Sequence, residues 1–460
     1  MSEPLYKKNI KQLIEKIDRE YPDNSQFKQA THELINDIAA YIEQQEFNES
    51  EQRYYLEVLR ILIEPDRVIQ FRVDWEDDAG KFHSNRGFRV QFNNTLGPYK
   101  GGLRFTRNTN LDELMFLGFE QVFKNSLTGL PMGGAKGGSD FEPHGRSESE
   151  IRRFCQAFMT QLSHHIGPDR DIPAGDIGVG TREIGYMFHQ YKTIKNQFRG
   201  VLTGKHPVFG GSCIREEATG YGCVYFAEHM MEALDNTLEG KKCGVSGAGN
   251  VAIYTAKKLI EKNSKVITLS DSKGVYVNED GISNEELDAI IQARAKRIRL
   301  KDMKQLSGEY HKDKKPWHLK LDLAFPCATQ NELDEEDAKS LVDNKAIAVI
   351  EGANMPCTDG AIQLLEKKGV VMGPSKAVNA GGVAVSGLEI SQNRSRLSWE
   401  ADQVDEKLKA IMKNIHTTCI DYGEKIGDKT NYRKAANIAS FIKVAKAIEF
   451  SGLVPLPESH

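Results

Sequence analysis

Residues 242–252 of this chain read Lys-Cys-Gly-Val-Ser-Gly-Ala-Gly-Asn-Val-Ala. The first five are typical of a short strand, and the spacing Gly-x-Gly-x-x-Ala follows directly. A strand, this turn and then a helix form the context of a dinucleotide fingerprint, because the glycines let a pyrophosphate approach the amino end of the helix. The stretch therefore predicts a Rossmann-like domain, with an ordinary strand-to-helix turn as the alternative. The predicted cofactor contacts of this turn are Gly247, Gly249, Asn250 and Val251.

The next predicted strand, residues 265–270, ends at Asp271. A carboxylate near this spacing accepts a hydrogen bond from the adenosine ribose, and it favours NAD(H) because it repels a 2′-phosphate. Basic residues follow, however. Arg294 and Arg297 are three residues apart, so both lie on one predicted helix face and could clamp a phosphate. A solvated basic helix face is the alternative interpretation of this cluster.

A second glycine-rich stretch, residues 131–138, reads Pro-Met-Gly-Gly-Ala-Lys-Gly-Gly and places Lys136 among four glycines. A lysine held near other cations or apolar walls loses proton affinity and can act as an acid or base near neutral pH. The alternative is a glycine-rich surface turn with a solvated lysine. The neighbouring motifs favour the first interpretation.

Three of these motifs are Gly-Pro-Tyr-Lys-Gly-Gly at residues 97–102, Gln-Val-Phe-Lys-Asn at 121–125 and Pro-Ala-Gly-Asp at 173–176. Together with Gly-Gly-Ala-Lys-Gly-Gly, they make the chain resemble the hexameric, small-subunit glutamate dehydrogenases from about residue 54 to its end. The resemblance implies an α/β fold of two domains, an N-terminal substrate domain with a mixed sheet and a Rossmann-like domain. It also implies a homohexamer.

By this resemblance, Lys100 and Ser386 hold the distal carboxylate of the substrate, while Gln121 and Lys124 hold its α-carboxylate. Lys136 activates the water that adds to the imine, with its proton affinity lowered by Lys124 and Lys100. Asp176, which follows Gly175, carries the proton to and from the amino group. The implied substrates are L-glutamate, 2-oxoglutarate and ammonium, with ammonium assimilation in the reductive direction.

The resemblance also implies cofactor contacts outside the glycine turn, although Glu216 stands where the family more usually has a proline. Asp-Ser at residues 271–272, followed by basic residues, is similar to the NADP-dependent branch, so we favour NADP(H), with NAD(H) as the alternative. The predicted contacts of the 2′-phosphate are Ser272, Lys273, Arg294 and Arg297. The other contacts implied are Arg215, Thr219, Ala328, Thr329, Asn354 and Asn379.

Length and patterning predict two domains in a chain of 460 residues. Apolar residues recur at helical spacing over 5–17, 111–126 and 435–448, whereas they alternate over 69–75 and 88–92 as in strands. The turn-rich residues 200–211 predict a hinge. We therefore expect residues 1–205 to form the substrate and oligomerisation domain, to which residues 430–460 return. Residues 206–429 are expected to form the dinucleotide-binding domain.

Composition restricts the remaining classes. A net charge of −4 argues against a nucleic-acid or anionic-membrane binder. No apolar stretch is long enough to cross a bilayer, and no Cys, His or carboxylate spacing predicts a metal site. Seven cysteines without a Cys-x-x-Cys pair predict reduced thiols and a cytoplasmic location.

Two rival functions are another amino-acid dehydrogenase, for leucine, valine or phenylalanine, and a non-catalytic dinucleotide sensor. Lys100 argues against the first, because an apolar substrate needs an apolar group there. The combination of Lys136 and Asp176 argues against the second, because a sensor needs no such pair.

Overall fold

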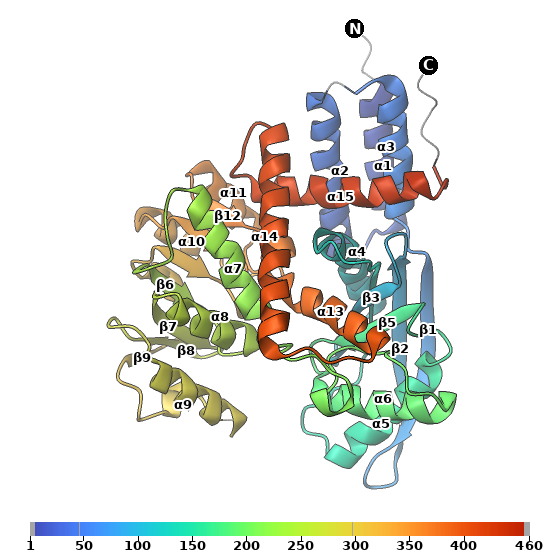
Figure 1. Ribbon diagram of the computed structural model, residues 1–460, viewed down its shortest axis with the longest axis horizontal. Coiled ribbons are helices and arrows are strands. Elements are labelled where there is room, and N and C mark those ends of the chain that lie inside the picture. Colours follow the sequence, from blue (N-terminus) through green and yellow to red (C-terminus); the bar gives the residue numbers. More distant parts are fainter. Residues whose placement is uncertain (1–4, 46, 297, 455–460) are drawn as a thin grey trace. The chain divides into compact units, whose positions relative to one another are not determined.

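The computed structural model describes residues 5–45, 47–296 and 298–454 (Figure 1). Contacts between Cα atoms divide the chain into two compact units. Unit 1 takes its described residues from Met1–Cys213, Ser386–Val404 and Asn437–His460, and unit 2 takes them from Ile214–Val385 and Asp405–Ala436. Within the described residues, no helix is long and apolar enough to cross a membrane.

Unit 1 is built around a five-stranded sheet in the order β1-β2-β4-β3-β5. Strand β2 is antiparallel to β1 and β4, whereas β3 is parallel to β4 and β5, so the sheet is mixed as predicted. The strands are β1 (Arg67–Glu76), β2 (Phe82–Asn93), β3 (Tyr99–Phe105), β4 (Gly134–Ser139) and β5 (Asp171–Gly175). The helices are α1 (Leu5–Glu20), α2 (Ser25–Gln44), α3 (Glu49–Leu62), α4 (Leu111–Leu127), α5 (Glu148–Leu162) and α6 (Thr181–Lys195).

Local sequence explains several of these elements. Along β1 the inward residues Val73 and Trp75 are buried while their neighbours are exposed, which confirms the predicted alternation. Helix α5 begins with a capping box in which Ser147 accepts from the Glu150 backbone and the Glu150 side chain accepts from the Ser147 backbone. Helix α4 begins at Asn110, whose side chain accepts from the backbone of Glu113. This cap fixes the start of a helix that packs on β4.

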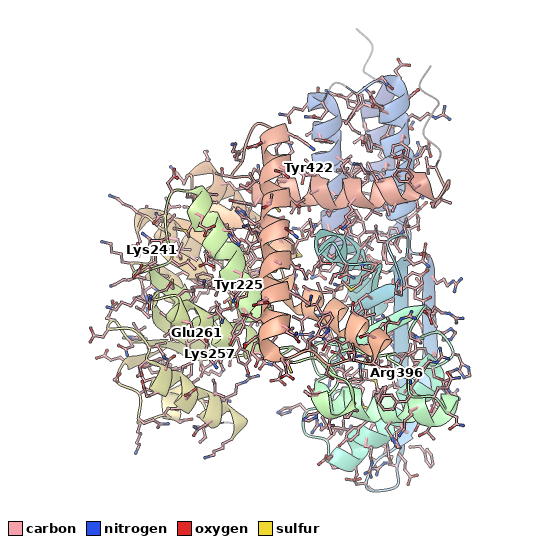
Figure 2. All side chains as sticks on the ribbon, in the orientation of Figure 1. Tyr225, Lys241, Lys257, Glu261, Arg396 and Tyr422 are labelled. Carbon is pink, nitrogen blue, oxygen red and sulfur yellow. The ribbon has the colours of Figure 1, made fainter. Side chains whose placement is uncertain are left out.

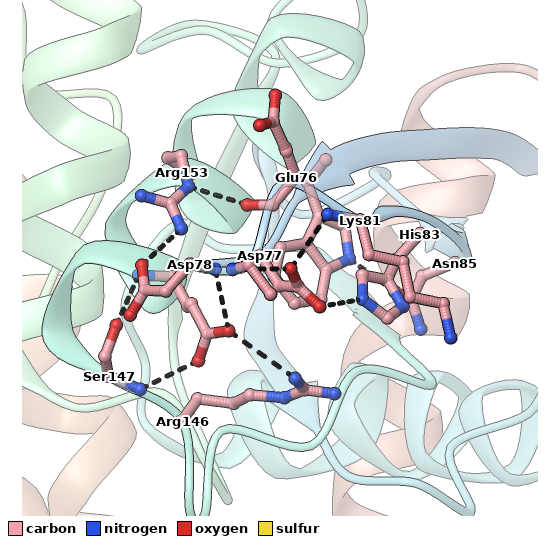
Figure 3. Close-up of polar contacts among 12 residues, drawn as sticks. Glu76, Asp77, Asp78, Lys81, His83, Asn85, Arg146, Ser147 and Arg153 are labelled. Atoms are coloured by element: carbon pink, nitrogen blue, oxygen red, sulfur yellow. Dashed lines mark hydrogen bonds and ion pairs between the residues drawn. The ribbon is translucent and has the colours of Figure 1, made fainter.

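Polar contacts hold the turn between β1 and β2 against the start of α5 (Figure 3). The carboxylate of Asp77 lies 2.7 Å from Nε2 of His83, and the His83 ring stacks on Trp75 with centroids 4.7 Å apart. Arg153 of α5 donates to Asp78 at 2.6 Å and to the carbonyl of Glu76 at 2.6 Å. The turn is therefore tied to the helix beside it.

Unit 2 contains a seven-stranded sheet in the order β12-β11-β10-β6-β7-β8-β9. Five strands are parallel and form a Rossmann-like sheet, and β8 and β9 add an antiparallel edge. The strands are β6 (Lys242–Val245), β7 (Lys265–Asp271), β8 (Gly274–Val277), β9 (Glu309–Lys312), β10 (Leu323–Phe325), β11 (Ala348–Ile350) and β12 (Val371–Gly373). The helices wholly within this unit are α7 (Ala218–Ala233), α8 (Asn250–Glu261), α9 (Asn284–Ala295), α10 (Glu335–Asp343), α11 (Asp359–Lys367) and α12 (Ser375–Val378).

Three helices carry the chain across the boundaries between units: α13 (Gly381–Ser395), α14 (Ala401–Lys425) and α15 (Tyr432–Phe450). In unit 2, Tyr225 of α7 donates to Asp405 of α14 at 2.6 Å, and Figure 2 marks Tyr225 beside that helix. In unit 1, Asn437 of α15 donates to Asp37 of α2 at 2.7 Å, and the Tyr54 hydroxyl of α3 donates to the carbonyl of Ala445 at 2.5 Å. Each part of these helices is thus anchored in its own unit.

The contact units differ from the division expected from the sequence. Residues 206–213 and 386–404 were expected in the dinucleotide-binding domain but belong to unit 1, and the chain returns to unit 1 at Asn437 rather than at residue 430. The physical reason is a buried junction: Lys205 Nζ lies 2.7 Å from Glu389 Oε1, and Gln392 donates to the Ser212 hydroxyl at 2.8 Å. The functions expected of the two domains stay predictions.

Candidate functional site

Lys136 on β4 and Asp176 directly after β5 form an ion pair of 2.9 Å. Strand β3 lies between β4 and β5, so the lysine side chain crosses β3 to reach its partner. Gly102 of β3 leaves the necessary space, because a Cβ atom there would lie 2.8 Å from the Cβ atom of Asp176. A glycine without side-chain bulk is therefore required where the pair meets.

The glycine-rich stretch around Lys136 is a strand and not a surface turn. All of β4 is buried, and Lys136 is 5% exposed. A Cβ atom on Gly138 would lie 2.1 Å from the carbonyl oxygen of Arg104 in the neighbouring strand. The solvated-turn alternative is therefore wrong, and this glycine serves the close approach of two strands.

Arg104 and Glu113 extend this pair into a cluster of four charged side chains. Arg104 Nε donates to Oδ2 of Asp176 at 2.8 Å, and Arg104 Nη1 donates to Oε1 of Glu113 at 2.5 Å. The sequence analysis missed both residues. The sequence did contain a signal for Arg104. It stands two residues after Gly102 and four residues after Lys100, so all three lie on the same face of the strand.

This cluster determines the proton affinities of its members. Burial would raise the pKa of Asp176, but Lys136 and Arg104 hold it at about 2. Burial lowers the pKa of Lys136; Asp176 opposes this shift and Arg104 adds to it. The predicted direction for Lys136 is right, and burial is the largest cause, with Arg104 adding to it. The contribution expected from Lys124 and Lys100 stays a prediction.

Helix α4 supplies the amide and the second lysine predicted for the site. Gln121 donates to Asn125 at 2.7 Å, and Asn125 in turn donates to the carbonyls of Lys100 at 3.1 Å and Gly133 at 2.5 Å. Lys100 is 1% exposed on β3, and Lys124 is half-buried on α4. Asn125, which the sequence analysis did not select, thus ties α4 to the strand of Lys100 and to the segment before Lys136.

Ser386 belongs to the same unit as these residues. It is buried near the start of α13 and accepts a hydrogen bond of 3.3 Å from the Thr203 hydroxyl. A Cβ atom on the next residue, Gly387, would lie 2.5 Å from Leu130 and 3.0 Å from Met132, in the segment that leads to β4. Unit 1 therefore holds all the predicted substrate residues: Lys100, Gln121, Lys124, Lys136, Gly175, Asp176 and Ser386.

A fully buried ion pair supports the strands of the site. Arg89 Nε on β2 donates to Asp171 at the start of β5 at 2.9 Å, and Arg89 Nη1 donates to the carbonyl of Gly101 at 3.2 Å. A Cβ atom on Gly137 of β4 would lie 2.9 Å from Cδ of Arg89, so this side chain also crosses a strand at a glycine. Arg89 thereby links β2 to β3 and β5 across β4, and sequence reasoning did not find it.

In unit 2, the glycine turn after β6 has the geometry that a pyrophosphate requires. Gly247 has φ of 87°, a left-handed conformation that favours glycine. Gly249 is the N-cap of α8, and a Cβ atom there would meet no atom within 4 Å. The open space at the amino end of a helix fits an anionic group. Asn250 and Val251 form the first turn of that helix.

Asp271 ends β7 as predicted, and its two carboxylate oxygens differ. Oδ1 accepts from the Tyr310 hydroxyl at 2.7 Å and from the backbone of Lys273 at 2.8 Å. Oδ2 is buried and has no hydrogen-bond partner within the described part of the chain. A buried acceptor without a donor is costly, so this atom fits a ligand hydroxyl such as that of a ribose.

One basic side chain reaches the glycine turn. Arg294 donates to the side-chain oxygen of Asn250 at 2.5 Å, whereas Ser272 and Lys273 are exposed. Helix α9 ends at Ala295, one residue after Arg294. Arg297 itself lies outside the described residues.

Four of the remaining predicted cofactor residues, Ala328, Thr329, Asn354 and Asn379, follow the carboxyl ends of parallel strands, where open α/β sheets bind ligands. The backbone amides of Ala328 and Thr329, after β10, donate to Glu332 at 2.9 and 3.4 Å. Asn379 donates to the Asn354 side chain at 2.9 Å, and its own oxygen is buried without a hydrogen-bond partner among the residues described. A Cβ atom on Gly382 would lie 2.4 Å from Thr219 and 3.5 Å from Arg215, so those two residues share one corner.

Metal ligands were not expected from the sequence. The described ranges contain no group of three or more His, Cys, Asp or Glu side chains that could hold a metal ion. The buried acceptors and the glycine turn of unit 2 suit a dinucleotide, and the cations of unit 1 suit a small anionic substrate.

Comparison with known proteins agrees with this geometry. Residues 210–452 match the Glutamate/Leucine/Phenylalanine/Valine dehydrogenase family, and residues 65–193 match its dimerisation domain. The chain is 49% identical to the NADP-specific glutamate dehydrogenase of Giardia intestinalis, over 97% of this chain and 99% of the relative. It is also 49% identical to the NAD-specific glutamate dehydrogenase of Bacteroides fragilis, over 97% of this chain and 100% of the relative.

Among solved structures, the crystal structure of Plasmodium falciparum glutamate dehydrogenase matches with a TM-score of 0.94 and 48% identity, over 97% of this chain and 95% of that one. The predicted two-domain α/β fold with a mixed sheet and a Rossmann-like sheet is confirmed. Because the two sequence relatives above are named for different cofactors, overall identity does not select NADP(H) or NAD(H).

Proposed function

Because the chain belongs to the glutamate/leucine/phenylalanine/valine dehydrogenase family, we propose that it is a glutamate dehydrogenase that prefers NADP(H). The reaction is the reversible oxidative deamination of L-glutamate to 2-oxoglutarate and ammonium. The observation that carries this proposal is the buried Lys136–Asp176 ion pair of 2.9 Å, on the sheet that also bears Lys100. A non-catalytic dinucleotide sensor has no use for such a buried pair of charges.

The substrate residues of unit 1 fit a dicarboxylate. Lys100 is 1% exposed, and a buried ammonium group is a suitable partner for a carboxylate, so the distal carboxylate binds there together with the Ser386 hydroxyl. Gln121 and Lys124 of α4 hold the α-carboxylate. Each charge-assisted hydrogen bond contributes about 1.5–3 kcal/mol. An apolar amino acid has no distal carboxylate to offer Lys100, which opposes the leucine, valine and phenylalanine alternatives.

Lys136 and Asp176 carry the proton transfers. In deamination, the carboxylate of Asp176 takes a proton from the substrate ammonium group, and the hydride then leaves Cα. Lys136, with its lowered pKa, takes a proton from the water that attacks the imine carbon and stabilises the carbinolamine oxygen that forms. Asp176 returns its proton to the nitrogen, the C–N bond breaks, and the proton of the hydroxyl group that becomes the carbonyl of 2-oxoglutarate passes to the released ammonia, which gives ammonium. When bound, the nicotinamide ring supplies the acceptor or donor of the hydride.

We also propose that the enzyme prefers NADP(H) to NAD(H). Arg294 lies at the amino end of α8, where its contact with Asn250 places a guanidinium group beside the glycine turn, and Ser272 and Lys273 follow Asp271 directly. These groups favour a 2′-phosphate. NAD(H) is the alternative, supported by the buried free Oδ2 of Asp271, which suits a ribose hydroxyl.

Assembly and location extend the proposal. We infer a homohexamer from the resemblance seen in the sequence, and the match of residues 65–193 to a dimerisation domain supports an oligomer. A cytoplasmic location is supported by the cysteines, because all seven are free thiols.

The substrate proposal is tested with a panel of amino acids oxidised in parallel with NADP+ and NAD+. L-Glutamate should give a kcat/KM at least about 10²-fold above L-leucine, L-valine and L-phenylalanine, because none of these has the distal carboxylate that the site is proposed to bind. A preference for any apolar amino acid would identify another member of the family instead. Absence of turnover with every member of the panel would support the sensor.

A further inference from the structure

We propose that Arg104 and Glu113 are positioning residues for the reaction. Glu113 holds Arg104 in place, and Arg104 keeps the carboxylate of Asp176 oriented and ionised while Lys136 turns to the attacking water. This inference rests on the proposed function, in which Asp176 moves the amino proton.

The two cations share one oxygen of Asp176. Lys136 Nζ lies 2.9 Å and Arg104 Nε lies 2.8 Å from Oδ2. Lys136 must leave this oxygen when it turns to the attacking water, and Asp176 would then be free to rotate. Arg104 remains in place, because its guanidinium plane is fixed at a second point by Glu113. A planar guanidinium held at two points is well suited to orient a carboxylate.

Glu113 is itself held in place at a local cost in stability. Its backbone is fixed by the Asn110 cap at the start of α4, with a hydrogen bond of 3.0 Å. Its Oε1 atom accepts from Arg104, whereas its Oε2 atom is buried with no hydrogen-bond partner in the described chain. A buried acceptor without a donor destabilises the folded state. The presence of Glu113 is therefore better explained by its effect on Arg104 than by a contribution to the stability of the folded protein.

The cluster of four charged side chains contains two cations and two anions. The charged groups that face Asp176 are Lys136 from β4 and Arg104 from β3, and Glu113 of α4 lies behind Arg104. The side chains are 6% exposed for Lys136, 11% for Arg104 and 19% for Asp176, so water screens them weakly. Loss of Arg104 therefore raises the proton affinity of Asp176, and loss of Glu113 leaves Arg104 uncompensated and lowers it.

The test compares Arg104→Met, Arg104→Lys and Glu113→Gln with the wild type, by the pH dependence of kcat for L-glutamate and by KM. Arg104→Met should lower kcat by about 10²-fold, the worth of a positioned acid or base, and change KM for L-glutamate by less than about threefold. The acid limb of kcat should move to higher pH in Arg104→Met and to lower pH in Glu113→Gln. Arg104→Lys should recover part of kcat, because it restores the charge without the second anchor.

Arg86→Met is the matched control, since Arg86 pairs with Asp140 at 3.0 Å on an exposed part of β2 and should leave kcat unchanged. If Arg104→Met does not fold, Glu113→Gln still decides, because glutamine keeps the size and shape of the glutamate side chain and the acid limb alone is read. A wild-type kcat and pH profile in Arg104→Met, or an acid limb that moves the same way in both variants, overturns the inference. A wild type that does not oxidise L-glutamate contradicts the proposed function itself and the inference with it.

Discussion

Lys136 reaches Asp176 by crossing the strand that lies between them, at the single position where Gly102 leaves room. The ion pair thus depends on a residue that has no side chain of its own. A buried lysine that spans a neighbouring strand is held by both strands, so the position of its ammonium group is restricted.

Gly102→Ala should therefore damage the site directly. The new Cβ atom would lie 2.8 Å from Cβ of Asp176 and 3.0 Å from the carbonyl of Gly175, which forces the carboxylate away from Lys136. Overpacking of this kind costs about 1–3 kcal/mol, and we expect kcat for L-glutamate to fall at least about tenfold. Gly167→Ala is the control, because its Cβ atom would lie 3.8 Å from the Tyr191 hydroxyl, an ordinary contact. Equal activity in the two variants would show that the close approach at residue 102 does not matter.

Lys100→Leu should remove recognition of the distal carboxylate and leave dinucleotide binding intact. The lysine is buried in unit 1, whereas the predicted dinucleotide contacts lie in unit 2. We expect kcat/KM for 2-oxoglutarate to fall by about 10²-fold or more, since the substrate carboxylate loses its partner. Fluorescence titration with NADPH checks that the cofactor still binds. An unchanged kcat/KM would remove Lys100 from the substrate site.

Asp176→Asn should bind both substrates but lose turnover by about 10²–10⁴-fold, the usual contribution of a positioned acid or base. The amide keeps the shape of the carboxylate, so a large loss in kcat with little change in KM separates proton transfer from packing. Near-normal kcat would mean that another group moves the proton.

The turn between β1 and β2 should lose order in acid. The His83 hydrogen bond lowers the pKa of Asp77 to about 2, below the ordinary aspartate value of about 3.9. A lowered carboxylate pKa gives stabilisation that is present above the ordinary value and is lost as the pH falls through the folded value. Amide protection factors at the turn, which are exchange rates corrected for the intrinsic rate at each pH, should therefore stay high near pH 5 and fall between about pH 4 and pH 2. The variant Asp77→Asn should show no such acid step; a step of equal size would assign the effect elsewhere.

Arg294→Ala should raise KM for NADPH far more than KM for NADH. The guanidinium group lies beside the glycine turn through Asn250, and an electrostatic contact with a 2′-phosphate should weaken as salt rises. Lys296→Ala, an exposed lysine two residues further on, is the matched control. An equal rise in both KM values, or a wild type that prefers NADH, would show that Asp271 selects NAD(H) by accepting a hydrogen bond from the ribose hydroxyl.

Much of the fold follows from local patterns in the sequence. The alternation in β1 and the glycine turn after β6 each depend on neighbours in the chain, and both predictions are confirmed. The nature of β4 was missed, because four glycines in six residues are typical of a turn when the strands that need them are not yet known.

The site residues that could not be selected from the sequence were missed for one common reason. Arg104, Glu113, Asn125 and Arg89 act through neighbours brought close by the strand order β2-β4-β3-β5 and by the packing of α4. No local pattern contains that order. The contact units differ from the expected division at residues 386–404 for the same reason, since the assignment of these residues depends on the buried contact between Lys205 and Glu389.

The most direct measurement is the absorbance of the reduced nicotinamide band when the full-length protein is mixed with 2-oxoglutarate, ammonium and either NADPH or NADH. We expect absorbance to fall only when 2-oxoglutarate and ammonium are both present, with one L-glutamate formed per cofactor oxidised and with NADPH consumed faster than NADH. No fall in absorbance with either cofactor, under conditions in which the protein is folded and binds the dinucleotide, would contradict the account.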